Sequence, residues 1–299
     1  MVWNLCKSLV TFILILLGFI FVLLLPREME VEAIGFSQYE AAHPFTMDLY
    51  MDNMKAFVTY FQTEKGFGTT LAGTPILEEV QRYLGRSLKI IIPTFILVLL
   101  FGTLVGVLQF NYRSKKRGKI LSFFSSILSS IPDFFLFIAI QYLLIKLIQA
   151  GLPRFHLFGS DYWYSFIIPL ISLMIFPLLH MVRMTVVAME SEMSQEYVRT
   201  VLAKGLSRIQ AIKHILRNCW STIINQSQWV MLYIISSLPI IERLSNYNGA
   251  GDQLLYSILN NEDIRAFALM LPFLLIMFFI HVGANVLKFI ILPKEGKQG

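Results

Sequence analysis

The sequence predicts an all-α membrane protein with six transmembrane helices, on three observations. Of its 299 residues, 56% are hydrophobic and only 15% are charged, whereas a soluble domain carries roughly 25% charged residues. Apolar stretches of about 20 residues, the length that crosses a bilayer, recur along the chain. Lys and Arg gather in the short segments between these stretches. The six predicted helices are 8–25, 88–110, 120–148, 164–188, 221–241 and 266–292.

The first, third and fifth stretches each carry a distinguishing feature. The first follows Lys7, and no small-residue cleavage site adjoins its end at Pro26, so we expect an uncleaved anchor helix over residues 1–26. The third is interrupted at Pro132. The fifth is the least apolar, because it contains Asn225, Gln226, Gln228, Ser236 and Ser237.

The loop charges predict the orientation. Basic residues dominate the segment after the second helix, the segment 189–220 and the C-terminal tail 293–299, whereas the other short loops are acidic or nearly neutral. The positive-inside rule then places both termini and both basic loops in the cytoplasm. Residues 27–87 form an extracytoplasmic loop by alternation, either solvated throughout or with a small helical element near Phe57, and residues 88–292 form a five-helix core.

Several function classes find no support in the composition. The net charge of +6 is explained by the basic loops, so it does not indicate nucleic-acid binding. Cys6 and Cys219 are expected to be free thiols. The five histidines lack the spacing of metal ligands, and no catalytic set emerges. We therefore predict no metal site and no enzyme activity in this chain.

The basic segment 189–220 is amphipathic. Tyr197, Val198 and Val201 share one helical face, Gly205 interrupts the pattern, and an apolar stripe resumes after it. This pattern predicts two short helices joined at a glycine, outside the bilayer, that dock to another protein. The alternative is an amphipathic helix lying on lipid headgroups. The later stripe is Ile209, Ile212 and Leu216, and the basic residues are Arg199, Lys204, Arg208, Lys213 and Arg217.

Motifs in this segment and elsewhere resemble one known family. Gly205 lies ten residues before Ile215, as in the general permease signature. The run from Tyr197 through Ala203-Lys204-Gly205-Leu206-Ser207 to His214 and Arg217-Asn218 resembles the cytoplasmic loop of binding-protein-dependent ABC transporter permeases, closest to the dipeptide/oligopeptide/nickel type. Weaker matches keep the same order: Gly66-Phe67-Gly68-Thr69-Thr70, Ile92-Pro93-Thr94, Ser130-Ile131-Pro132-Asp133-Phe134, and Glu242 followed by Gly249-Ala250-Gly251.

The resemblance implies the type I ABC importer permease fold, with an extracellular loop domain after the first helix, in a bacterial-type cell membrane. It implies that the 196–218 loop couples the chain to separate ATPase subunits. The residues implied in coupling are Tyr197, Arg199, Ala203, Lys204, Gly205, Leu206, Ile212, His214, Ile215, Arg217 and Asn218.

The resemblance also implies partners. These are a second permease subunit, by family usage in a heterodimer, two ATPase subunits that bind ATP and Mg²⁺, and an extracytoplasmic solute-binding protein. The chain has no G-x-x-x-x-G-K-[ST] phosphate loop, so we expect it to bind no cofactor itself. Peptides are the implied substrate, with nickel or metal chelates second. Two rivals are an ion-coupled secondary transporter and a sensor subunit that moves no solute.

Polar residues within the spans are candidates for the translocation path, because polar groups in a bilayer tend to face the protein interior. They are Asp133, Gln141, Asn225, Gln228 and Glu242. The alternative is that they form hydrogen bonds between helices. The chain departs from the family at Val201, Leu202, Thr222 and Asn248. The changes in and after the fifth helix leave the usual substrate open.

Overall fold

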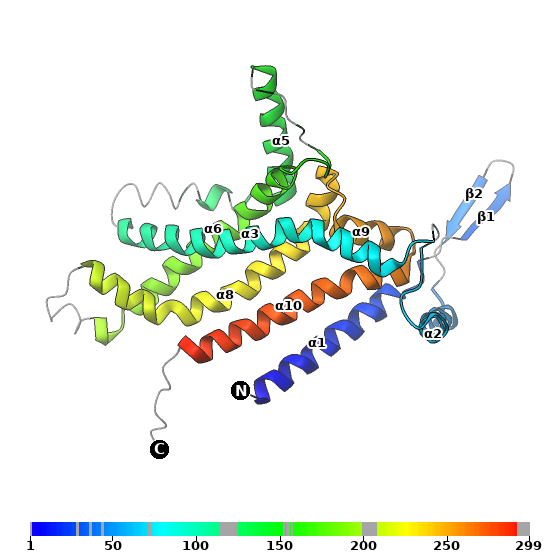
Figure 1. The fold of residues 1–299 in the computed structure, drawn as a ribbon, viewed down its shortest axis with the longest axis horizontal. Helices are drawn as coiled ribbons and strands as arrows, with labels where there is room; N and C mark the ends of the chain where they lie inside the picture. Colours follow the sequence, from blue (N-terminus) through cyan, green and yellow to red (C-terminus); the bar gives the residue numbers. More distant parts are fainter. Residues whose placement is uncertain are drawn as a thin grey trace.

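Long helices run side by side in the computed structural model, and α5 projects from them (Figure 1). The structure describes residues 2–27, 30–35, 38–42, 45–70, 73–113, 125–128, 130–151, 158–198 and 208–291, with single positions 123, 153 and 156. The elements in chain order are α1 Val2–Leu23, β1 Glu30–Gly35, β2 Gln38–Ala42, α2 Met47–Glu64, α3 Ile76–Tyr112, α5 Asp133–Gln149, α6 Ile167–Met193, α8 Arg208–Ser245, α9 Ala250–Leu259 and α10 Asp263–Ile291.

The helical prediction is confirmed for the bundle, with one correction. An antiparallel pair of strands, β1 and β2, lies in the loop after the first helix, so the described chain is not purely helical. Four of the described helices, α1, α3, α6 and α10, are long and apolar enough to cross a membrane. The count of six spans and the status of residues 27–87 as a loop domain stay predictions.

Two helices extend well beyond their predicted apolar stretches. α3 begins at Ile76 and α8 begins at Arg208, whereas residues 88 and 221 were expected. Pro93 lies inside α3. Tertiary contacts stabilise the polar early turns of α3: Arg265 pairs with Glu79 at 3.1 Å. Hydropathy cannot find such turns, because it records only the part of a helix that lipid would cover.

The α8 boundary corrects the prediction of two short helices joined at a glycine. The second of these, from Arg208 onward, forms the first turns of one uninterrupted helix that ends at Ser245. Gly205 and its neighbours 199–207 lie outside the described residues. The described later part of the predicted docking segment, residues 208–218, is therefore continuous with the predicted fifth helix.

Glycines permit the close contact between α3 and α6. A Cβ atom at Gly102 would lie 2.6 Å from the Cβ of Met181, and one at Gly106 would lie 2.6 Å from the Cβ of Thr185. Small residues four apart let two helix backbones approach closely within a bilayer. Met181 and Thr185 are fully buried at this crossing.

The segment after the first helix packs on the bundle through aromatic rings. Phe61 of α2 lies 5.7 Å from Phe67 and 6.0 Å from Phe267 of α10, centroid to centroid. Edge-to-face rings at this distance stabilise a contact beyond the area they bury. The helical element expected near Phe57 is thus part of α2, and α10 holds it in place.

The two ends of the bundle differ. The start of α1, the end of α10, the end of α6 and the start of α8 lie at one end, whereas α2, both strands and α9 lie at the other (Figure 1). The orientation of these ends relative to a membrane stays a prediction from the loop charges. We call these the basic end and the α9 end.

Candidate functional site

The basic end joins α6 to α8 through Tyr197. Its hydroxyl donates a 2.7 Å hydrogen bond to Glu192 Oε2 at the end of α6, and it also bonds the Asn218 side chain of α8. Burial, together with the bond to Glu192, raises the pKa of Tyr197 to about 12, so the hydroxyl keeps its proton. Two residues predicted for coupling, Tyr197 and Asn218, are thus brought together.

The first turns of α8 present two faces. Ala211, Ile215 and Cys219 recur every four residues and are buried, which fixes this part of the helix to the bundle. His214, Arg217 and Asn218 are exposed, Ile212 is half-buried, and Ile209 is 81% exposed. The exposed surface is therefore basic with an apolar residue at its tip. Five further predicted coupling residues, Arg199, Ala203, Lys204, Gly205 and Leu206, lie outside the described residues.

Stacked rings line the contact between α6 and α8. His180 stacks on Trp229 at 3.7 Å, Trp229 on Tyr233 at 5.5 Å, and Tyr233 on Phe176 at 4.7 Å. His180 Nε2 also lies 3.2 Å from Gln226 Oε1. All four rings are partly exposed. We call Phe176, His180, Trp229 and Tyr233 the aromatic ladder. The sequence did not predict it, although two rings of α6 and two rings of α8 are each spaced four residues apart.

The predicted path residues do not converge on one point. Asp133, at the start of α5, is close enough to Tyr233 of the aromatic ladder to interact with it electrostatically. Asn225 is exposed on α8, whereas Gln228 Oε1 contacts His281 Nδ1 of α10 at 3.0 Å. Gln141 is buried, and its amide nitrogen has no hydrogen-bond partner among the described residues. The structure therefore places Asp133 beside the ladder and Gln228 on another side of α8.

Glu242 lies in a fully buried junction between α3, α8 and α9. Ser87 Oγ of α3 donates to Glu242 Oε1 at 2.6 Å, and the N–H of Asp252 donates to Oε2 at 3.0 Å. The N–H of Ala250 donates in turn to Ser87 Oγ at 2.8 Å. These bonds satisfy a carboxylate that would be costly to bury alone. Its assignment to the translocation path stays a prediction, and its contacts favour holding three helices together.

The turn after α8 explains why glycine and asparagine follow Glu242. A Cβ atom at Gly249 would overlap the carboxylate of Glu242. Asn248 has φ +55°, a left-handed conformation that asparagine tolerates and that the ring of proline forbids. A 2.7 Å hydrogen bond from the Gln253 amide to Asn248 Oδ1 stabilises this turn.

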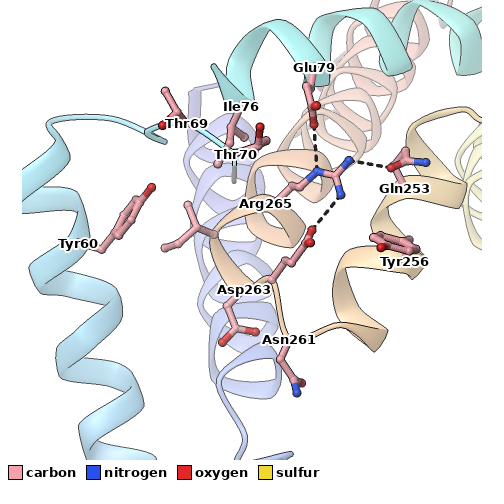
Figure 2. Close-up of a pocket in the computed structure, with 12 residues that line it drawn as sticks. Tyr60, Thr69, Thr70, Ile76, Glu79, Gln253, Tyr256, Asn261, Asp263 and Arg265 are labelled. Carbon is pink, nitrogen blue, oxygen red and sulfur yellow. Dashed lines mark hydrogen bonds and ion pairs between the residues drawn. The ribbon is translucent and has the colours of Figure 1, made fainter. Parts of the chain in front are cut away.

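A polar pocket of about 650 Å³ opens at the α9 end. Figure 2 shows Arg265 at its centre, between α3 and α9. Arg265 bonds Glu79 at 3.1 Å, Glu262 at 2.9 Å and Gln253 at 2.7 Å. Since its fork of donors is occupied by these three partners, Arg265 braces the wall rather than offering a free cation. Among the described residues there is no cluster that could hold a metal ion.

Replacing Arg265 by leucine should lower the free energy of unfolding by about 3 kcal/mol, because Glu79 and Glu262 would lose their ion-pair partner, whose side chain is only 14% exposed. Arg82 provides a matched control: it lies 4.0 Å from the same Glu79 but is 59% exposed. Arg82→Leu should cost less than about 1 kcal/mol. Thermal unfolding in detergent measures both. Equal losses for the two variants would contradict the bracing role of Arg265.

Comparison with known proteins gives three findings. A family described as binding-protein-dependent transport system inner membrane component matches residues 87–296. The glutathione transport system permease protein GsiC of Salmonella typhi is 25% identical over 194 residues, which is 64% of this chain and 62% of that protein. GsiC of Escherichia coli strain K12 is 24% identical with the same coverage. The matched region thus spans less than two thirds of these relatives.

The third finding concerns the fold. A chain from the inward-facing MetNI methionine ABC transporter is similar to this one with a TM-score of 0.59. The similarity covers 73% of this chain and 99% of that chain, at 14% sequence identity. At this identity the likeness supports the arrangement of the helices alone.

Proposed function

This chain belongs to the family of binding-protein-dependent transport system inner membrane components, and we propose that it is the permease subunit of an ATP-driven importer of peptides. It would pair with a second permease subunit in a heterodimer. Two ATPase subunits that bind ATP and Mg²⁺ would drive it, and a solute-binding protein would deliver the substrate.

The continuity of α8 carries this proposal. The helix runs from Arg208 at the basic end to Ser245 at the α9 end, about 57 Å at 1.5 Å per residue. A movement imposed on Ile212–Asn218 is therefore transmitted along one helix as far as Tyr233, before Pro239 removes a backbone hydrogen bond from α8. Rigid-body rocking of such elements is a common way to alternate access to a binding site.

The aromatic ladder suggests where the solute passes. The partly exposed face of α8 that carries Trp229 and Tyr233 also presents Asn225 and Ser236, and Asp133 reaches it from α5. A second permease subunit placed against this face would enclose a channel with aromatic walls and polar groups. Such a lining suits peptide backbones, which offer both hydrogen-bonding groups and flat amide planes.

The substrate class is supported by the sequence resemblance and by GsiC, whose name states glutathione transport. Glutathione is a short peptide, so the two indications agree. A nickel or metal-chelate importer is the second candidate by family. A secondary transporter would need no ATPase, and with a sensor subunit ligand binding would stimulate hydrolysis by the ATPase subunits without any uptake.

Charge reversal at Arg217 should weaken binding to the ATPase subunits, because this exposed side chain lies on the basic surface of α8. The loss should be largest at low ionic strength, since salt screens exposed charges. Lys55→Glu is the control: Lys55 is also exposed, and it lies on α2 at the opposite end, where it pairs with Asp52 at 3.1 Å. Co-purification of ATPase subunits measures the effect. Unchanged retention for Arg217→Glu would favour contact with lipid headgroups instead.

Gly205→Pro tests the coupling of ATP hydrolysis to peptide uptake, measured in reconstituted vesicles that contain all subunits. We expect peptide uptake to stop while ATP hydrolysis continues, because α8 would no longer move with the ATPase subunits. Normal uptake in this variant would contradict the proposal that movement of α8 couples the ATPase subunits to transport. Uptake that survives ATP depletion would identify a secondary transporter, and ligand-stimulated hydrolysis without any uptake would identify a sensor.

A further inference from the structure

A cleft of about 420 Å³ lies between α1 and α10 near the basic end. Neither the coupling segment nor the aromatic ladder contributes to it. Its polar lining is Lys7, Ser8 and Thr11 from α1 with His281 and Asn285 from α10. Its apolar lining includes Phe12 and Ile15 from α1 with Met277 and Phe278 from α10. The cleft is therefore amphipathic.

Polar and apolar groups are separated along the depth of the cleft. α1 and α10 run in opposite directions (Figure 1), so the early residues of α1 face the late residues of α10. Lys7 and Asn285 consequently lie toward the basic end, and Phe12 and Phe278 meet deeper, with ring centroids 5.1 Å apart. From Lys7 to Ile15 the helix rises about 12 Å. A ligand that fits has a polar head and an apolar tail.

The polar end offers hydrogen-bond donors and positive charge. No salt bridge among the described residues uses Lys7, and its side chain is exposed. Gln228 Oε1 can only accept, so His281 Nδ1, 3.0 Å away, carries the proton. Asn285 Nδ2 then donates to His281 Nε2 at 3.2 Å. This bond fixes the orientation of the Asn285 amide and leaves its second N–H available to a ligand.

The contact between α1 and α10, on either side of the cleft, is small. α1 packs chiefly on α10, and much of its surface is exposed, including Leu14 at 63% and Ile15 at 53%. Arg27 secures the far end of α1 through Asp263 and the carbonyl of Ile258, the latter at 2.8 Å. Near Lys7 no equivalent ion pair joins the two helices among the described residues. A ligand that touches both would strengthen this end.

We propose that the cleft is a binding site for one anionic phospholipid, with the phosphate at Lys7 and Asn285 and an acyl chain between Phe12, Ile15 and Met277. Basic pockets between helices on the cytoplasmic side of a membrane bind anionic headgroups. A lipid fits the cleft because its polar end is positively charged, its deeper part is lined by apolar residues, and it opens beside a membrane span. Occupancy ties α1 to α10 and, through His281 and Gln228, to α8.

Native mass spectrometry of the intact transporter, titrated with phosphatidylglycerol or phosphatidylcholine, tests the site. Wild type should retain one phosphatidylglycerol more strongly than phosphatidylcholine. Lys7→Gln should weaken that retention about fivefold, the value of one basic residue at an anionic headgroup. Lys288→Gln is the matched control, since Lys288 lies in the last turn of the same α10 outside the cleft and should leave retention unchanged.

A second pair of variants tests the apolar end without changing charge. Ile15→Trp should fill the cleft and lower retention of phosphatidylglycerol, whereas Leu14→Trp, on the neighbouring exposed surface, should not. Phosphatidylglycerol should also raise the melting temperature of wild type more than that of Ile15→Trp. Equal retention by all four variants would overturn the proposal, as would displacement of the lipid by millimolar inorganic phosphate, which would indicate an anion site alone.

Cross-linking from Cys6 can identify the molecule that occupies the cleft. It is exposed and adjoins Lys7, whereas Cys219 is buried, so a photoreactive thiol reagent should label Cys6 selectively. Irradiation in vesicles of phosphatidylglycerol should yield a lipid adduct that Ile15→Trp reduces. An adduct with a partner subunit in its place would show that protein fills the cleft, and the lipid proposal would fail.

Discussion

Glu242→Ala should lower the free energy of unfolding by about 3 to 5 kcal/mol, because it leaves buried donors of α3 and α9 without an acceptor and opens a cavity. Gly249→Ala should also be destabilising on its own, since its methyl group would overlap the carboxylate of Glu242. In the double variant the clash disappears. The second substitution should then cost much less than it does in wild type, a strong positive coupling for residues in contact.

Melting temperatures of the four proteins in detergent measure this cycle, and Glu190→Ala serves as the control because Glu190 is 51% exposed. The control should lose less than about 1 kcal/mol. Strictly additive losses for Glu242→Ala and Gly249→Ala would contradict the contact. A Glu242→Ala protein that keeps full stability but loses peptide uptake would instead favour the translocation-path assignment of this residue.

Gly106→Leu should prevent α3 and α6 from packing and reduce the yield of folded protein sharply. Its Cβ would lie 2.6 Å from Thr185 Cβ and 2.9 Å from the carbonyl oxygen of Val182, and a backbone atom cannot move aside without separating the helices. Overpacking a well-filled contact typically costs about 1 to 3 kcal/mol and more when the backbone must shift.

Gly283→Leu is the matched comparison, since no atom lies within 4 Å of a Cβ at Gly283 in α10. Both changes replace a helical glycine by a strong helix former, so propensity is equal and only the surrounding space differs. Gel filtration and thermal unfolding after solubilisation should show a folded Gly283→Leu protein and a destabilised Gly106→Leu protein. Similar behaviour of the two would show that the α3–α6 contact is looser than the structure indicates.

The sequence was informative where burial follows from hydropathy alone. Four apolar spans, the basic end and the amphipathic segment that opens α8 could all be predicted, because lipid and water impose these patterns on each helix separately. The polar extension of α3 to Ile76 and the strand pair could not, since Arg265 and other residues distant in sequence stabilise them. Glu242 was chosen as a candidate for being polar, yet only its contacts with Ser87 and Asp252 indicate what it does.

By itself the sequence determined the class of protein, the order and approximate placement of four apolar helices, and the family resemblance through the register of Gly205 and Ile215. Only the tertiary structure decided that residues 208–218 of the docking segment form the first turns of α8, that four rings stack between α6 and α8, and that Lys7 faces Asn285 across a cleft. The physical reason is that hydropathy acts on one helix at a time, whereas sites arise where side chains from several helices meet.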